Sequence, residues 1–384
     1  RQRQMCIRDR ADQPDQTIQR LLDLVSKIER RSVYLALLVE NPLALSQLVR
    51  LSSASPWISH FLKQYPLLLD ELLDPRSLYA PPDHPELVAE LSRRLLGVSM
   101  DDQELVMEIL RQFKHANVRR VAAADIVDAL PLMKVSDHLS WIAETVRDEA
   151  LEQAWHHLTA RHGRPPLKGE GKGFAIIGYG KLGGLELGYG SDLDLVFLHG
   201  AESETDMTDG DSPLALQVFF ARLGQRLIHV LTAYTPAGLL YEVDMRLRPD
   251  GASGMLVSSL KSYEAYQRDK AWLWEHQALV RARPVAGDRA IGERFQTIRR
   301  AILAQPRDEA ELRQVILDMR RRMREELDGS KANEFDLKQG VGGIVDIEFM
   351  VQFGVLAHAH SHPALLDYTD NICCLLYTSD AADD

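Results

Sequence analysis

The chain has 384 residues, of which 45% are hydrophobic and 26% are charged, and its formal net charge is −11 at pH 7. This length allows two or three domains with substantial cores, and no run of about 18 apolar residues predicts a membrane-spanning helix. The negative charge argues against a protein that binds along a nucleic-acid backbone, because such proteins usually carry a basic face.

Both ends of the chain differ in composition and periodicity from the segments that they flank. We expect residues 1–10 (RQRQMCIRDR) and residues 373–384 (CCLLYTSDAADD) to be non-native sequence, which would make this chain an internal fragment of a longer protein. The three cysteines, Cys6, Cys373 and Cys374, all lie in these two segments. The body of the chain therefore has no thiol for disulfides, zinc or redox chemistry, and the cytoplasm is the expected location.

The first region of the chain, residues 11–165, is predicted to be helical and to act as a linker or regulatory region. Apolar residues recur three and four positions apart from about Thr17 to Arg161. The predicted helices are interrupted at Pro42, Pro56, Pro66 and Pro75.

The clearest predicted helix has Ser136 or Asp137 as its N-cap and ends at Gly163. Its apolar stripe is formed by Leu139, Ile142, Ala143, Val146, Ala150, Ala154 and Leu158.

A second region, residues 166–290, changes to short β-rich runs after the linker-like segment HGRPPLKGEGKG. The predicted strands are FAII from Phe174, DLDLVFLH from Asp192 and LLYEVDMRLRP from Leu239. Helices are expected between them, and WLWEHQALVRAR is read as helical. After Ala286 the pattern stays helical apart from the turn KQGVGG, which predicts the start of a C-terminal helical domain over residues 291–372. The predicted fold class is α+β.

Gly178, Gly180 and Gly183 follow the first predicted strand with the G-x-G-x-x-G spacing of a dinucleotide-binding turn. That fold needs a full helix before the next strand. Here the next strand begins at Asp192, which leaves room for barely two turns of helix. We therefore disfavour the dinucleotide interpretation.

Asp192 and Asp194 open an otherwise apolar strand. Side chains alternate between the two faces of a strand, so both carboxylates point the same way, about 6.5 Å apart. Their repulsion is on the order of 2 to 3 kcal/mol at an effective dielectric near 20, which favours a bound divalent cation. The alternative for this motif is a pair of aspartates in a solvated turn.

The segment YEVDMRLRP adds a third carboxylate and two arginines. If it is one strand, its period of two places four charged residues on one face: Glu242, Asp244, Arg246 and Arg248. An edge strand with a ladder of ion pairs is the alternative. Together with the first pair of aspartates, however, this set suits Mg²⁺ and the phosphates of a nucleoside triphosphate. The backbone amides of residues 178–184 and the hydroxyl of Ser191 would approach the same phosphates.

These motifs resemble a known fold and a known family. A small glycine loop, D-x-D on a strand and a later single Asp resemble the polymerase-β type of nucleotidyltransferase, although Lys181 stands where that fold usually has a second small residue. The segments GYGKLGGLELGYGSDLDLVFLH, MTDG, YEVDMRLRPDGASGML, WLWEHQALVRAR and GGIVDIEF resemble the glutamine-synthetase adenylyltransferase family. The resemblance covers about residues 20–372.

This resemblance implies a function, because members of the family carry two nucleotidyltransferase domains on one long chain. The present motifs resemble the second domain, which transfers AMP from ATP to a tyrosine hydroxyl of glutamine synthetase and releases pyrophosphate. Phosphorolytic removal of AMP, which releases ADP, and a non-catalytic fragment that docks on glutamine synthetase and PII protein are the alternatives. Glutamine synthetase and PII protein are the implied partners.

The resemblance also implies roles for individual residues. Two Mg²⁺ ions would be held by Asp192, Asp194 and Asp244, with Asp244 completing the nucleophile side or acting as a base. The residues expected to bind the nucleotide are Gly178, Gly180, Lys181, Gly183, Gly184, Ser191, Arg246 and Arg248.

Three further features are given structural interpretations. Trp272 and Trp274 are expected to pack within an amphipathic helix rather than to stack on adenine. Asp346 and Glu348 are expected to offset a helix dipole rather than to contact a nucleotide or partner. No function is assigned to the alternating histidines His358, His360 and His362.

Overall fold

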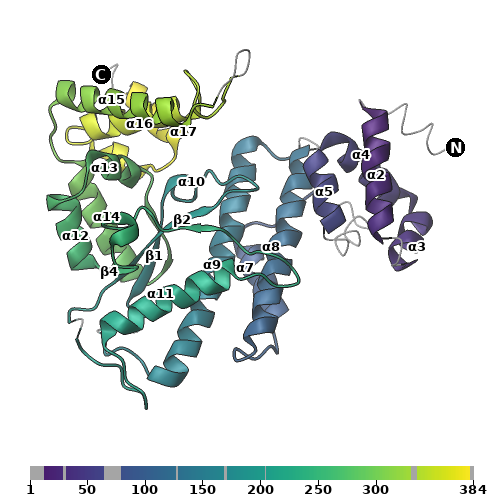
Figure 1. Ribbon diagram of the computed structural model, residues 1–384, viewed down its shortest axis with the longest axis horizontal. Helices are drawn as coiled ribbons and strands as arrows, with labels where there is room; N and C mark the ends of the chain where they lie inside the picture. Colours follow the sequence, from purple (N-terminus) through teal and green to yellow (C-terminus); the bar gives the residue numbers. More distant parts are fainter. Residues whose placement is uncertain are drawn as a thin grey trace. The chain divides into compact units, whose positions relative to one another are not determined.

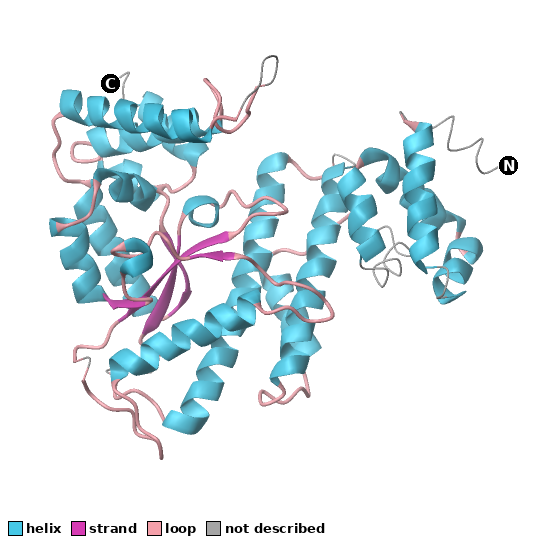
Figure 2. Ribbon diagram, in the orientation of Figure 1, coloured by secondary structure: helices cyan, strands magenta, loops and turns pink. Residues whose placement is uncertain are grey.

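The computed structural model describes residues 13–28, 32–64, 79–126, 129–167, 171–203, 205–329 and 335–380. They divide into two compact units: a helical unit, from residues 1–146 and 234–240, and a sheet unit, from residues 147–233 and 241–384. Helices and one small mixed sheet make up the fold, which confirms the predicted α+β class (Figures 1 and 2). The predicted domain boundaries at residues 165 and 290 remain predictions.

The helical unit is built from helices and includes the first half of the long helix α9 (Leu132–His162). The others are α2 (Pro14–Ile28), α3 (Ser32–Glu40), α4 (Pro42–Ala54), α5 (Pro56–Gln64), α7 (His84–Leu95) and α8 (Gln103–Ile126). Pro42 and Pro56 are the first residues of α4 and α5, where a missing N–H removes no helical hydrogen bond. Pro66 and Pro75 lie outside the described residues.

Helix α9 confirms the predicted apolar stripe, because all seven of its members are buried. The predicted start at Ser136 or Asp137 is wrong. The helix begins at Leu132, where the carbonyl of Pro131 accepts the N–H of Lys134 at 2.8 Å, and Asp137 forms an ion pair with Lys134. Gly163 ends the helix with φ of +75°, as predicted, since glycine adopts this left-handed conformation at little cost.

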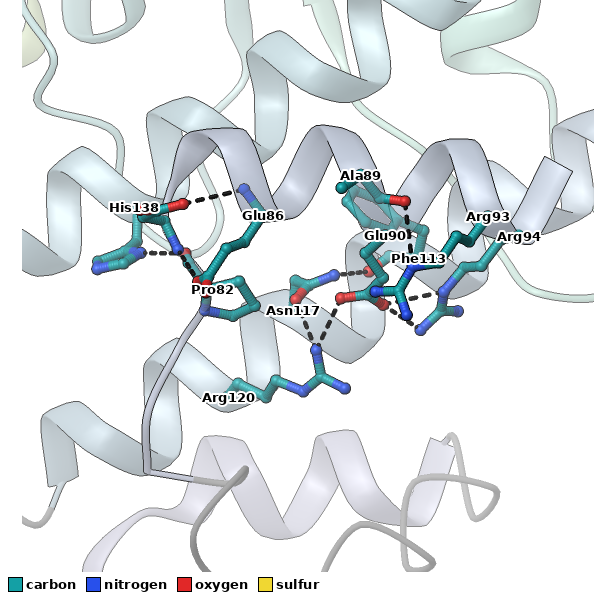
Figure 3. Close-up of polar contacts among 11 residues, drawn as sticks. Pro82, Glu86, Ala89, Glu90, Arg93, Arg94, Phe113, Asn117, Arg120 and His138 are labelled. Atoms are coloured by element: carbon teal, nitrogen blue, oxygen red, sulfur yellow. Dashed lines mark hydrogen bonds and ion pairs between the residues drawn. The ribbon is translucent and has the colours of Figure 1, made fainter. Parts of the chain in front are cut away.

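Helices α7, α8 and α9 are joined by a small set of polar contacts (Figure 3). Glu90 of α7 accepts hydrogen bonds from Nε of Arg94 and from Nη1 of Arg120 on α8, both at 2.9 Å. The Glu90 side chain is only 14% exposed. Nδ1 of His138 on α9 lies 2.9 Å from the carbonyl oxygen of Pro82, just before α7. Glu90 is thus a largely buried negative charge that is neutralised by Arg94 and Arg120.

In the sheet unit, five short strands form one sheet: β1 (Phe174–Gly178), β2 (Leu193–His199), β3 (Val243–Asp244), β4 (Val257–Ser259) and β5 (Arg283–Gly287). The order is β3-β2-β1-β5, and β4 also pairs with β2. β1 runs antiparallel to β2 and β5, whereas β3 and β4 run parallel to β2. The antiparallel β1–β2 pair excludes a Rossmann βαβ unit, in agreement with the sequence.

Helices cover both faces of this sheet. They are α10 (Gly180–Gly183), α11 (Leu216–Thr232), α12 (Leu260–Asp269), α13 (Leu273–Val280), α14 (Arg289–Leu303), α15 (Glu309–Leu327), α16 (Ile344–His358) and α17 (Asn371–Asp380). Ile177 of β1 belongs to a core shared with α12–α14 and α16, while the Phe174 ring lies 6.2 Å from that of Phe220 on α11. Every residue of β1 is buried, which explains its unbroken apolar run. None of the described helices is long and apolar enough to cross a membrane.

Two predictions about strands were wrong. The strand predicted from Leu239 is reduced to Val243–Asp244, because the Asp244 carboxylate accepts the backbone N–H of Arg246 at 2.8 Å and turns the chain. Glu242, Asp244, Arg246 and Arg248 therefore do not share one face of a strand. β4 was not predicted, and β5 lies within the stretch predicted as helical.

Replacement of Glu90 by Gln should lower the free energy of unfolding by about 1 to 3 kcal/mol, because it leaves Arg94 and Arg120 without their partly buried counter-charge. Glu264→Gln is the control. Glu264 forms an exposed pair with Arg268 on α12, and its loss should change stability by less than about 0.5 kcal/mol. Urea unfolding followed by circular dichroism measures both variants, and equal effects would contradict the role of Glu90.

Candidate active site

Three carboxylates converge where β2 and β3 begin to pair. Asp192 directly precedes β2, Asp194 is its second residue, and Asp244 ends β3. The parallel register places Asp194 opposite Asp244, and each of the three offers an oxygen within 4.8 Å of the others. Leu193, between the two aspartates of β2, is fully buried. The alternation of the strand thus turns both aspartates to one side.

The negative charges of the three carboxylates repel one another. The pKa of Asp194 is raised to about 6, first by burial and then by the charges of Asp192 and Asp244, against the opposing effect of Arg246 and Arg281. A divalent cation would relieve this repulsion, and carboxylate oxygens are the ligands that Mg²⁺ prefers. Among the described residues, this is the only cluster of three such side chains with the spacing of a metal site. The residues fit a hard divalent cation.

Arg246 supplies the nearest positive charge. Its Nε donates to Oδ2 of Asp244 at 2.7 Å, and its backbone N–H donates to Oδ1 of the same carboxylate. These contacts lower the pKa of Asp244. The Arg246 side chain is 82% exposed, so it can leave Asp244 at little packing cost.

Arg248, expected from the sequence to bind the nucleotide, contacts its own loop in this structure. Its guanidinium donates to the backbone carbonyls of Met245 at 2.7 Å and Ala252 at 3.0 Å. The chain between them turns through Asp250 and Gly251, which both have positive φ. Arg248 therefore holds together the loop that follows β3.

Gly180 lies directly against the carboxylates. Its φ is +53°, and a Cβ at this position would lie 2.4 Å from Oδ2 of Asp194. Only glycine combines this backbone conformation with such close approach to a carboxylate. Gly180 is therefore fitted closely against the Asp194 carboxylate. Lys181, the next residue, is exposed on α10.

The other glycines pack against the protein itself. A Cβ on Gly183 would lie 1.9 Å from the carbonyl oxygen of Arg281, and one on Gly178 would lie 2.9 Å from side-chain carbons of two neighbours. The backbone N–H groups of Gly183 and Gly184 already donate to carbonyls of Tyr179 and Gly180. Ser191 closes the next loop, where its Oγ accepts the N–H of Gly188 at 3.0 Å.

Sequence reasoning missed the charged side chains that support the glycine segment. Arg281, which is only 5% exposed, forms ion pairs with Glu186 and Glu348. Arg283 on β5 donates to the carbonyls of Leu182 and Gly183, both at 3.1 Å. The signal was present in WLWEHQALVRAR, where two arginines follow the end of a helix, but that segment was read as helical.

The remaining expectations have mixed outcomes. Trp272 and Trp274 are 70% and 42% exposed, so their predicted packing is wrong: the buried positions of α13 are Glu275, Gln277, Leu279 and Val280. Asp346, in the first turn of α16, accepts the N–H of Gly342 and forms ion pairs with Arg320 and Arg324. Its expected effect on the helix dipole stays a prediction. Glu348 pairs with Arg281 instead. His358, His360 and His362 belong to no metal-binding cluster among the described residues.

Comparison with known proteins gives a consistent match. The family model described as glutamate-ammonia ligase adenylyltransferase matches residues 45–298. Proteins called bifunctional glutamine synthetase adenylyltransferase/adenylyl-removing enzyme are similar over 94% of this chain: those of Thioalkalivibrio sulfidiphilus, Nitrosococcus oceani and Pseudomonas putida are 61%, 55% and 53% identical. The chain spans 38% of the length of each of these relatives.

Gly180→Ala should destabilise the fold by about 1 to 3 kcal/mol, since the added Cβ meets Asp194 and φ is positive. Gly190→Ala is the matched control in the same loop region, because no atom lies within 4 Å of a Cβ built there. Thermal unfolding of the two variants distinguishes them. An equal shift in Tm would show that Gly180 is not fitted to Asp194.

Asp194→Asn should stabilise the metal-free protein at pH 7.5 by on the order of 1 to 3 kcal/mol. The folded-state pKa of about 6 lies above the ordinary value for an aspartate carboxyl in an unfolded chain, so ionised Asp194 costs stability above pH 6. This cost falls as the pH drops from 6 towards 4, and the gain from the variant should shrink over the same range. Urea unfolding in EDTA at pH 7.5 and pH 5 measures it, and a gain independent of pH would contradict the assignment.

Proposed function

Because this chain belongs to the glutamate-ammonia ligase adenylyltransferase family, we propose that it transfers AMP from ATP to a tyrosine hydroxyl of glutamine synthetase. In this reaction the tyrosine oxygen forms a bond to the α-phosphorus of ATP. The bond between the α-phosphorus and the oxygen that bridges it to the β-phosphate breaks, and pyrophosphate leaves. The observation that carries the proposal is the convergence of Asp192, Asp194 and Asp244 within 4.8 Å. Nucleotidyl transfer needs such a set of metal ligands beside its phosphates.

The three carboxylates would hold Mg²⁺, which would neutralise charge on the phosphates and favour ionisation of the attacking hydroxyl. Tyrosine has a pKa near 10, so its anion is scarce at neutral pH, at a cost of roughly 4 kcal/mol. Asp244 is better suited to bind a cation than to act as a base, because its hydrogen bonds with Arg246 lower the pKa of its carboxyl and so make it a weaker base.

Arg246 would turn from Asp244 to the phosphates when the nucleotide binds, and there it would stabilise developing negative charge. Its exposure supports this movement. Arg248 would act indirectly by keeping the loop in shape, since its donors bind carbonyls of that loop. Gly180 would leave the Asp194 carboxylate uncovered, because it has no side chain at the point where it meets Asp194.

The relatives' names also include adenylyl removal. In the phosphorolytic form of that reaction, a phosphate oxygen bonds to the phosphorus of AMP, the P–O bond to tyrosine breaks, the tyrosine hydroxyl is restored by a proton, and ADP is the product. The same carboxylates would serve that reaction. We propose the adenylylating direction on the sequence motifs described above, and the experiment below tests both. PII protein as a partner rests on the sequence resemblance alone.

The decisive experiment incubates the 384-residue chain with unmodified glutamine synthetase, magnesium and α-labelled ATP. Label should appear on glutamine synthetase, and Asp192→Asn/Asp194→Asn should reduce the rate by at least about 1,000-fold, because the metal ligands are lost. Asp206→Asn/Asp211→Asn removes the same charge from exposed positions of another loop and should leave the rate unchanged.

A second arm supplies adenylylated glutamine synthetase and phosphate. Release of ADP without any labelling in the first arm would assign the removing direction instead. If neither reaction occurs while glutamine synthetase still binds the chain, the proposal is wrong for this fragment and a docking role replaces it.

A further inference from the structure

A basic cleft lies in the sheet unit, between the C-terminal half of α9 and the outer face of α11. Its volume is about 430 Å³, within the usual range for small-molecule sites. Six basic side chains line it: His157, Arg161, His162, Arg222, Arg226 and His229. No acidic side chain is among its described lining residues, although the whole chain carries a net charge of −11.

The three basic cleft residues that belong to α11 lie on a different side of that helix from the residues that face the core. Arg222, Arg226 and His229 are four and three positions apart and share one side of the helix, whereas Leu223 and Leu227 are fully buried on the other. Basic residues in the last turn of a helix commonly offset its dipole. Arg222 and Arg226 lie in the middle of α11, so the dipole does not account for them.

Arg222 is held in place by a buried histidine. His162 is 6% exposed, and its Nδ1 lies 2.7 Å from the carbonyl oxygen of Ser212. A carbonyl oxygen only accepts, so Nδ1 carries the proton and a neutral ring has its lone pair on Nε2. That Nε2 lies 3.4 Å from Nη1 of Arg222 and can accept its hydrogen. One N–H donor of the Arg222 guanidinium thus contacts His162, and this contact positions the remaining N–H donors.

The motif MTDG, residues 207–210, holds the backbone at and after His162 in place. The N–H of Gly210 donates to the carbonyl of His162 at 3.1 Å, and Oδ1 of Asp209 accepts the backbone N–H of Arg164 at 2.6 Å. A Cβ on Gly163 would lie 2.0 Å from the nitrogen of Gly210. Two backbones therefore meet directly at the end of α9, and the loop that supplies the Ser212 carbonyl is anchored there.

We propose that this cleft binds a small oxyanion with at least two negative charges, of phosphate or dicarboxylate type. Arg161, Arg222 and Arg226 supply planar guanidinium groups, whose paired N–H donors match the oxygens of either group. The site is separate from the three aspartates, and its assignment does not depend on the proposed adenylyl transfer.

Isothermal titration of the whole chain in EDTA, with pyrophosphate and with succinate as separate probes, tests this proposal. EDTA removes divalent cations, so the aspartate cluster should repel both probes. Arg222→Gln/Arg226→Gln should weaken binding by at least about tenfold, because two charged donors are lost. Arg289→Gln/Arg321→Gln removes equal charge from side chains that are 92% and 65% exposed elsewhere, and should leave the affinity unchanged.

The outcomes are distinct. Binding of pyrophosphate alone assigns a phosphate site, and binding of succinate alone assigns a dicarboxylate site. Absence of binding at millimolar concentration, or equal weakening by both double variants, overturns the proposal. Arg161→Gln, an exposed single change, repeats the test if the double variant does not fold. Asp192→Asn/Asp194→Asn should retain the binding whether or not it abolishes adenylyl transfer.

Discussion

Pairing of β2 with β3 is the constraint on which the site depends. Only this parallel register places Asp194 beside Asp244, and only the alternation of β2 adds Asp192 to the same side. The arrangement opposes stability, because like charges are gathered at the edge of a buried sheet. The apolar strands behind it must therefore supply the stabilisation, and β1 and β2 are buried almost throughout.

Arginines that carry no obvious chemistry make this arrangement rigid. Arg281 is held between two glutamates, Arg283 ties β5 to α10, and Arg248 fastens its own loop. Each guanidinium binds groups from segments that are distant in sequence or that turn sharply. These three arginines hold the backbone around the three aspartates in place. Positioning of this kind is what a preorganised site requires.

The sequence predicted the fold class, the first two strands and the aspartates of one face, because these follow from local periodicity. It failed where tertiary contacts override local pattern. The strand after Leu239 ended early because Asp244 bonds the backbone of Arg246, and no period reveals such a turn. β5 is short and ends in Gly287, so it resembled a helix terminus. Trp272 and Trp274 were misjudged because α13 buries Glu275 and Gln277 instead.

The contact between Arg246 and Asp244 means that the protein supplies a counter-ion to its own carboxylate cluster. With Arg246 in place, one carboxylate of the three is neutralised before any cation arrives. A divalent cation that displaced Arg246 would replace the single charge of the guanidinium with two charges. The affinity for that ion would be lowered by whatever the Arg246–Asp244 pair contributes, and the displaced guanidinium would then be available to an anionic ligand.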